Sequence, residues 1–388
     1  MRSNWKDSTL GEALAFANGK TSPERQTEGP FAVFGSNGPI GRSQHHNAPS
    51  NTIVIGRVGS YCGSVHFSRD PCWVTDNAIR AEARPGNYPF FLFCLLRDLD
   101  LNRWRAGSGQ PLLNQTILSS INVRLPSFQV QRAVGLFLQQ IDDRIDLLRE
   151  TNVTLESISQ ALFKSWFVDF DPVRAKAEGR EPEGMDAATA ALFPSEFEES
   201  ALGLIPKGWM CSRLRDLLEL LYGKALKSTD RRDGAVPVYG SGGITGHHDT
   251  PLVQNGSIII GRKGTVGSLY WEDAAFYPID TTFYVRPLTA PLTFCFYAMQ
   301  RLGLERMNTD AAVPGLNREN AYRLELVRPP EGLLHAFDAV AGSLRRSIRG
   351  NSTQAAVLSA LRGTLLPRLI SGKLRLPQAE AQVEEAIA

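Results

Sequence analysis

The segment IDDRIDLLRETNVTLESISQALFKSWF, residues 141–167, decides the fold. Its seam residues are spaced alternately by four and three, which places them on one stripe of a helix. From Leu136 to Asp171 there is neither proline nor glycine, so we expect a helix of roughly 30 residues, on the order of 45 Å long. So narrow an apolar stripe requires a partner helix. The seam consists of Ile141, Ile145, Leu148, Asn152, Leu155, Ser159, Leu162 and Trp166.

The composition is that of an ordinary globular protein of 388 residues, of which 43% are hydrophobic. No apolar run approaches the ~20 residues of a membrane span, and the first residues lack the apolar core of a signal peptide. The five cysteines show no Cys-x-x-Cys spacing. We therefore expect free thiols, a cytoplasmic location and no structural zinc.

The net charge is only +2, but it is distributed unevenly. Residues 169–200 contain nine acidic and three basic side chains, which gives −6 and leaves +8 for the rest of the chain. Two interpretations are open at this point: a solvated acidic linker beside two mildly basic domains, or the footprint of a nucleic acid.

The sequence contains a long internal repeat. VFGSNGPIG at 33–41 matches VYGSGGITG at 238–246, and IVIGRVGS at 53–60 matches IIIGRKGT at 258–265, both 205 residues apart. Trp5 and Trp209 are 204 apart, and QPLLN at 110–114 matches VPGLN at 313–317 at a spacing of 203. Because the matches keep one order and the spacing drifts slowly, the chain is a duplicated unit of about 200 residues.

Each unit begins with a globular part. The short β-branched runs that stop at glycine predict strands entering tight turns. PFFLFCLLRDL at 89–99 and LTFCFYAMQRL at 292–302 predict buried helices. We expect an α+β domain with a mostly antiparallel or mixed sheet.

Each unit ends in a long helix, and residues 334–366 are the expected copy of the first. Its seam again alternates by four and three, and Asn351 lies 199 residues after Asn152, which we take as its equivalent. The two helices should pair antiparallel, with approximate two-fold symmetry within one polypeptide and a domain at each end. Polar seam residues fix register, and Pro367 should close the second helix. The second seam is Phe337, Ala341, Leu344, Ile348, Asn351, Ala355 and Leu358.

Catalytic motifs are missing from the sequence. AsnGlyLysThr at 18–21 lacks the preceding glycine of a phosphate-binding loop. The motifs of an adenine methyltransferase and of a common nuclease do not occur either. We therefore expect no catalytic residue and no metal site in this chain.

The paired glycine turns are the best candidates for contacts with a partner. An arginine recurs at the same turn, as Arg57 and Arg262, and arginine binds phosphate or the edge of guanine; plain structural turns are the alternative. The histidine pairs at 45–46 and 247–248 occupy comparable places and fit a polar loop or a nucleic-acid contact better than a metal site. Ser108, Asn308 and Thr309 are weaker candidates. The expected DNA-contact residues are Ser36, Asn37, His45, His46, Arg57, Arg105, Gln110, Ser241, His247, His248, Arg262, Lys263 and Asn317.

The chain resembles the specificity subunit of a type I restriction-modification enzyme. The resemblance rests on ALFKSWFVDFDPVRAKAEGR at 161–180, GLIPKGW at 203–209, TLLPRLISGKL at 364–374 and the paired glycine turns. It covers the chain from about Trp5 to Leu374. The family implies two target-recognition domains, each of which reads one half of a split DNA sequence, with helices whose length sets the unread gap.

The resemblance also implies partners. Two methyltransferase subunits and the motor-nuclease restriction subunits would join the complex, and S-adenosylmethionine, Mg²⁺ and ATP would belong to them. The expected docking residues are Phe163, Trp166, Phe167, Phe170, Leu365 and Leu369. Two alternatives remain: a self-contained restriction or modification enzyme, and a coiled-coil scaffold without DNA contact. The expected boundaries are 1–127 and 203–330 for the recognition domains, 128–170 and 331–374 for the helices, 171–202 for the acidic linker and 375–388 for a tail.

Overall fold

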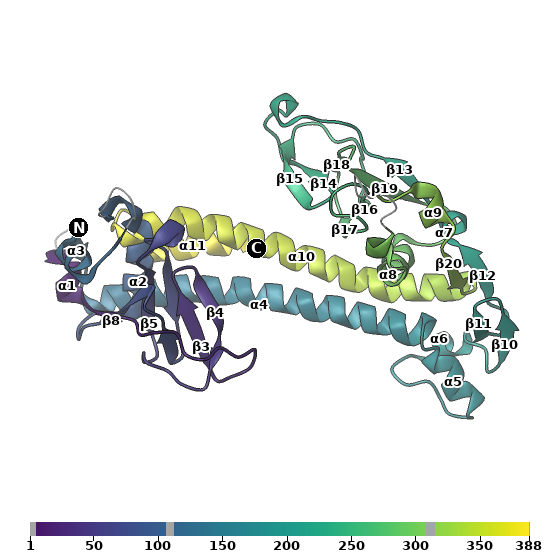
Figure 1. The fold of residues 1–388 in the computed structure, drawn as a ribbon, viewed down its shortest axis with the longest axis horizontal. Coiled ribbons are helices and arrows are strands. Elements are labelled where there is room, and N and C mark those ends of the chain that lie inside the picture. Colours follow the sequence, from purple (N-terminus) through teal and green to yellow (C-terminus); the bar gives the residue numbers. More distant parts are fainter. Residues whose placement is uncertain (1–4, 106–111, 308–314, 388) are drawn as a thin grey trace. The chain divides into compact units, whose positions relative to one another are not determined.

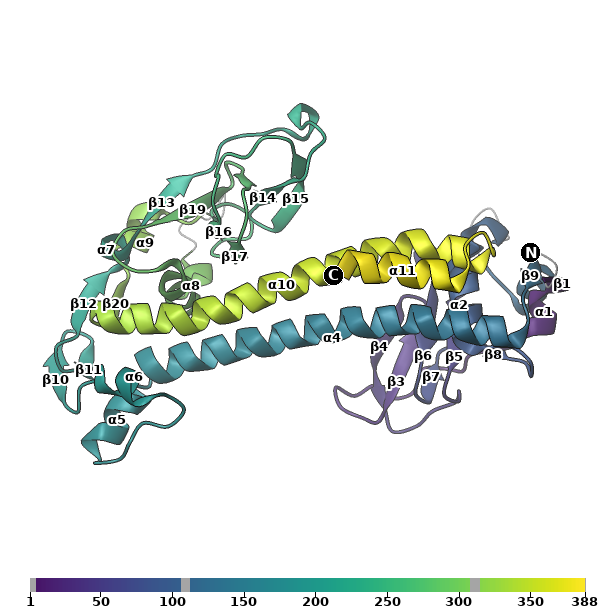
Figure 2. The ribbon, with the colours of Figure 1, turned by 180° about the vertical axis from the view of Figure 1, so that it is seen from behind.

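The computed structural model describes residues 5–105, 112–307 and 315–387, and Figures 1 and 2 show the chain from opposite sides. The chain divides into two compact units. Unit 1 comprises Met1–Arg149 with Thr353–Ala388, and unit 2 comprises Glu150–Ser352. Two 40-residue helices, α4 (Phe128–Phe167) and α10 (Glu331–Ile370), contribute to both units.

Unit 1 contains the first repeat, and its sheets are mixed as expected. Neighbouring strands pair antiparallel except β3 and β7, which pair parallel. One sheet has the order β2 (Leu14–Asn18), β8 (Ala78–Ala83), β5 (Thr52–Gly56), β6 (Val65–Ser68), and a second has the order β4 (Gly38–Ser43), β3 (Phe31–Gly35), β7 (Cys72–Val74). A third pairs β1 (Lys6–Thr9) with β9 (Asn122–Leu125).

The helices of unit 1 supply most of its core. The run predicted to be a buried helix forms α2 (Pro89–Asp98), and seven of its ten residues are buried. Helix α11 (Leu376–Ile387) runs beside α10 (Figure 1) and buries Ala379 in the same core, so the segment expected as a tail is helical. The other helical segments are α1 (Leu10–Ala13), η1 (Gly59–Tyr61), η2 (Leu101–Trp104) and α3 (Gln115–Ser120).

Unit 2 repeats the strand orders of unit 1, which confirms the duplication read from the sequence. Its sheets are β13 (Leu218–Tyr222), β19 (Thr282–Pro287), β16 (Ser257–Gly261), β17 (Leu269–Glu272); β15 (Gly243–His248), β14 (Val236–Gly240), β18 (Tyr277–Pro278); and β12 (Met210–Arg213) with β20 (Glu325–Arg328). The second predicted buried helix is α8 (Leu292–Arg301). The other helical segments are α7 (Leu214–Leu217), η3 (Ser228–Asp230), η4 (Leu304–Arg306) and α9 (Arg318–Tyr322).

Helices α4 and α10 pack together and run antiparallel, as predicted. Asn152, near the middle of α4, meets Asn351 of α10, whereas Phe167, at the end of α4, meets Phe337 near the start of α10. Every predicted seam residue of both helices is buried or half-buried. Buried polar contacts accompany the apolar seam, so the pairing is specified by more than hydrophobic area.

The two seam asparagines contact each other, but they are not equivalent in the repeat. Helices α4 and α10 begin at Phe128 and Glu331, 203 residues apart, and have the same length. The counterpart of Asn152 is therefore Ala355, and that of Asn351 is Leu148; both counterparts lie in the unit 1 core. The equivalence predicted from the spacing of 199 was therefore wrong. It paired two residues because both are asparagine, whereas equivalent positions of the two equally long helices are 203 residues apart throughout.

Two expected boundaries differ from the structure. Pro367 does not close α10, which continues to Ile370 because Leu369 and Ile370 are buried in the unit 1 core. Residues 171–202 are not an open linker. They form α5 (Asp171–Ala177), α6 (Ala187–Ala191) and β10 (Phe197–Ser200), which pairs with β11 (Gly203–Pro206), and they bury Val173 and Phe193. No helix in the described part of the chain is long and apolar enough to cross a membrane.

Candidate nucleic-acid interface

The first glycine turn of each repeat is a tight hairpin that packs against an aromatic ring. In unit 1 it joins β3 to β4, and Gly38 has φ +93°, with a Cβ position only 3.0 Å from His66 Cε1. In unit 2 the equivalent Gly243 has φ +103° over the ring of Tyr270. A larger residue would be strained at either position because of the positive φ, and at Gly38 it would also crowd the His66 ring. The turns are therefore fixed, and Asn37 is left exposed at the tip of the first.

The arginine turns follow β5 and β16 and make equivalent backbone hydrogen bonds. The backbone oxygen of Arg57 accepts from Leu113 N at 3.0 Å, and that of Arg262 accepts from Leu316 N at 2.8 Å. Arg262 Nη2 also donates to the carbonyl oxygen of Asp280 at 2.7 Å. The equivalence inferred from the sequence is therefore an equivalence of backbone geometry.

The two turns of each repeat lie against each other. In unit 1, Ser64 Oγ donates to the backbone oxygen of Ser36, and a Cβ on Gly56 would come 2.7 Å from that oxygen. In unit 2, Ser268 Oγ donates to the backbone oxygen of Ser241 at 2.6 Å. The structure thus brings the predicted Ser36 and Arg57 together, and likewise Ser241 and Arg262.

Other predicted contact residues have mixed placements. Arg105 is exposed. Burial raises the pKa of the nearby Cys62 thiol, and the charge of Arg105 offsets a small part of that rise. Lys263 is exposed beside Arg262. Asn317 is the N-cap of α9, and its side-chain oxygen accepts from Glu319 N and Asn320 N. Ser108, Gln110, Asn308 and Thr309 lie outside the described residues.

The histidine pairs are not equivalent, contrary to the prediction. His248 is the last residue of β15, and the last residue of β4 is Ser43. His248 is buried, and its Nδ1 accepts from Arg232 N at 3.0 Å, so its ring is part of the domain interior. His45, His46 and His247 are exposed. No group of three or more His, Cys, Asp or Glu side chains in the described ranges could hold a metal ion.

The residues expected to dock partner subunits are buried within this chain. Phe167 packs on Phe294, Phe337 and Trp209, with ring centroids 5.2–5.9 Å apart. Burial does not fit direct contact with a partner. These side chains instead attach the helix ends to the globular domains. The six residues are Phe163, Trp166, Phe167 and Phe170 in the unit 2 core, and Leu365 and Leu369 in the unit 1 core.

Beside Arg262 the structure has a stack of cationic and aromatic side chains that the sequence did not predict. Arg262 and Arg318 each place a guanidinium 5.1 Å from the ring centroid of Tyr222. Arg318 and Arg215 lie 5.8 and 5.7 Å from the ring of Tyr322. Such stacking holds a guanidinium plane in place and leaves its N–H edge available. The spacing of Arg318 and Tyr322 was the only sequence signal, and it is too common to be informative.

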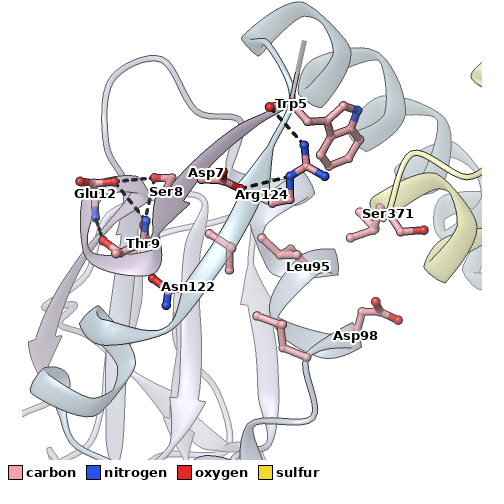
Figure 3. Close-up of a pocket in the computed structure, with 13 residues that line it drawn as sticks. Trp5, Asp7, Ser8, Thr9, Glu12, Leu95, Asp98, Asn122, Arg124 and Ser371 are labelled. Carbon is pink, nitrogen blue, oxygen red and sulfur yellow. Dashed lines mark hydrogen bonds and ion pairs between the residues drawn. The ribbon is translucent and has the colours of Figure 1, made fainter. Parts of the chain in front are cut away.

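A separate cavity of about 660 Å³ lies in unit 1 (Figure 3). Arg124 is bound there by Asp7, 3.2 Å away, and by the backbone oxygen of Trp5. Glu12 and Asp98 also line the cavity, and burial raises the pKa of Asp98. Three carboxylates against one arginine would repel a phosphate. The glycine and arginine turns are therefore the better candidates for contact with a nucleic acid.

Comparisons with known proteins agree with this geometry. The family model described as Type I restriction modification DNA specificity domain matches residues 2–157 and 206–320, one segment in each repeat. The HindI specificity subunit of Haemophilus influenzae is 24% identical over 359 residues, covering 74% of this chain and 77% of the relative. The MjaIX specificity subunit of Methanocaldococcus jannaschii is 22% identical over 368 residues, covering 85% and 79%.

A solved structure shares the fold. The crystal structure of the S subunit of a type I restriction-modification system from M. genitalium superposes with a TM-score of 0.65 at 18% identity, covering 94% of this chain and 96% of that one. The two proteins therefore share the fold described above. The chain belongs to the type I restriction-modification DNA specificity domain family. It is a specificity subunit, which is not itself catalytic.

Proposed function

We propose that this chain reads a DNA target split into two halves, one by each repeat domain. The observation that carries the proposal is the duplicated pair of turns, in which Arg57 and Arg262 follow equivalent strands and hold equivalent backbone bonds. Two modest sets of base contacts on one chain add in free energy, so selectivity multiplies. We assign the recognition domains to residues 1–127 and 203–330.

The proposal extends to the assembly. The HindI and MjaIX relatives are named as subunits of type I restriction enzymes. By the same division of labour, this chain would scaffold two methyltransferase subunits and join restriction subunits. S-adenosylmethionine, Mg²⁺ and ATP would act in those partners. The buried aromatic residues at the end of α4 would serve docking indirectly, by fixing the helix pair on which partners assemble.

Methylation mapping tests the proposal. The chain is co-purified with its methyltransferase subunit, genomic DNA is methylated in vitro, and the modified adenines are located by sequencing. We expect one bipartite motif with a fixed unread gap. Methylation scattered without a motif would overturn the proposal.

The two alternatives predict different results. A self-contained enzyme would bind S-adenosylmethionine as the isolated chain, which calorimetry would detect. A scaffold without DNA contact would show unchanged DNA affinity for Arg57→Ala and Arg262→Ala. The proposed function requires that DNA affinity falls in both variants.

A further inference from the structure

The second repeat domain has a cationic cavity beside its arginine turn. The cavity has a volume of about 500 Å³ and is lined by Arg262, Lys263, Arg318, Tyr222 and Glu319, among others. Among the described residues that line the cavity, the one acidic side chain is Glu319, which lies 3.2 Å from Arg215, so its charge is largely compensated. An excess of positive charge in a concave site favours an anionic ligand.

The arginines of this cavity have unused donors. The Nε groups of Arg262 and Arg318 are shielded from solvent and have no hydrogen-bond partner among the described atoms. Arg318 Nε lies 3.9 Å from Glu319 Oε1, too far for a hydrogen bond. Arg57 Nε of the first domain is in the same state, so the two domains differ here in the number of cations and not in this donor. An oxyanion in the cavity would balance the positive charge of the two guanidinium groups.

The tyrosines hold these donors in place. Tyr222 lies at the end of β13, and the guanidinium groups of Arg262 and Arg318 are each 5.1 Å from its ring centroid. Tyr322 Oη accepts from Leu220 N at 2.8 Å, which fixes the second ring of the stack to the same strand. The arginines are therefore ordered before a ligand arrives, which lowers the entropic cost of binding.

The first repeat domain keeps only one of these groups. By the repeat spacing, Arg57 corresponds to Arg262. The positions equivalent to Lys263, Tyr222, Arg318 and Tyr322 are occupied in the first domain, in that order, by Val58, Asn18, Gln115 and Ser119. Shared structure supports the alignment, because Asn114 and Asn317 are both N-caps of the short helices α3 and α9. At these positions the first domain carries one cation, and the second carries three.

We propose that the cavity of the second domain binds a backbone phosphate of the DNA beside the half-site that this domain reads. The inference rests on the proposed function and deepens it. A phosphate fits better than a base edge, because guanine needs one arginine, whereas three converging cations suit an oxyanion. The two half-sites are consequently held unequally: the second domain contributes more of the salt-dependent binding at this position than the first.

The test measures DNA affinity against salt. The probe is a fluorescein-labelled duplex of about 40 base pairs that contains the bipartite sequence methylated by the assembled complex. Binding to the full chain is followed by anisotropy from 50 to 300 mM KCl. For Arg318→Gln we expect about ten-fold weaker binding at low salt and a slope of log K against log[salt] that is shallower by about 1, uniformly across single-base variants of the duplex.

Matched variants separate the stack from the fold. Gln115→Ala, at the equivalent position of the first domain, should leave the slope unchanged. Tyr222→Phe keeps the ring and should behave like wild type, whereas Tyr222→Leu removes the ring and should weaken binding. Thermal unfolding of each variant controls for loss of structure.

The outcomes distinguish the two proposals. If wild type does not discriminate its bipartite duplex from a scrambled one, the proposed function fails. If wild type discriminates and Arg318→Gln keeps the wild-type slope, only the phosphate site fails. Loss of selectivity at one base position without a change of slope would also overturn it, because the contact would then be to a base.

Discussion

The two repeats share a backbone plan but use different side-chain chemistry at equivalent places. Beside its arginine turn, the second domain has the Arg262–Tyr222–Arg318 stack, where the first has Arg57 and neutral side chains. At the helix ends, Phe163, Trp166 and Phe167 of unit 2 correspond to Leu366, Leu369 and Ile370 of unit 1. Duplication preserves strand order and backbone hydrogen bonds, while side-chain charge and packing differ, because side chains can change without altering the backbone.

The largest expected difference lies in the helix cores. Phe337 is fully buried among aromatic rings in unit 2, and its counterpart Val134 is buried in unit 1. We expect Phe337→Ala to lower the free energy of unfolding by about 3–5 kcal/mol, and Val134→Ala by about 1.5 kcal/mol, since only about two methylene equivalents are lost. Urea unfolding of both variants measures the difference. Equal losses would show that the two cores do not differ in packing energy.

The next effect concerns the ion pairs between the helices. In unit 2, Arg345 binds Glu156 at 2.7 Å and covers the rings of Trp271 and Phe296. In unit 1, Arg362 binds Asp142 through two nitrogens. Arg345→Ala should therefore destabilise by about 1–2 kcal/mol more than Arg362→Ala, because it also loses the aromatic contacts. A thermal-shift comparison at fixed salt measures this, and the reverse order would refute the role of the rings.

A third comparison concerns the arginine turns. Arg57→Ala and Arg262→Ala should each weaken binding to the bipartite duplex, by about 1–3 kcal/mol if the contact is to a base. Only Arg262 lies in the cationic cavity, so its removal should also flatten the salt dependence more than removal of Arg57. Equal salt slopes for the two variants would show that the domains hold phosphate equally.

The smallest expected effect lies in the polar layer of the helix pair. Asn351 donates to Asn152 at 2.9 Å, whereas the equivalent layer is Leu148 and Ala355. The double variant Asn152→Ala with Asn351→Leu copies that apolar layer and should be neutral or stabilising by up to about 1 kcal/mol, because both members of the Asn351–Asn152 bond are removed together. Asn152 also donates to the Ile348 carbonyl, which lies within α10, and to Ser352, which is exposed to water. Asn152→Ala alone should destabilise, since Asn351 loses its acceptor. Melting temperatures of both variants, measured by calorimetry, test these predictions. A double variant that melts below wild type would contradict the first of them.

Much of the architecture could be predicted because periodic patterns in the sequence specify it. The alternation of four and three predicted both long helices, and matched glycine turns predicted the duplicated sheets. The candidate site was predicted less well. His248 was selected for its residue type, but its ring is buried against the Arg232 backbone. Phe163 and Trp166 were assigned to docking, although the neighbouring domain covers them, because a local pattern does not show what packs on it.

The sequence by itself determined the duplication, the helix seam beginning at Ile141, the arginine that recurs at the second turn and the family resemblance. These features repeat along the chain or depend on local spacing. Tertiary structure alone decided that Asn152 meets Asn351, that Pro367 lies within α10, and that Tyr222, Arg262 and Arg318 form one stack. Those contacts join residues from 40 to about 200 positions apart, and packing free energy rather than local propensity brings them together.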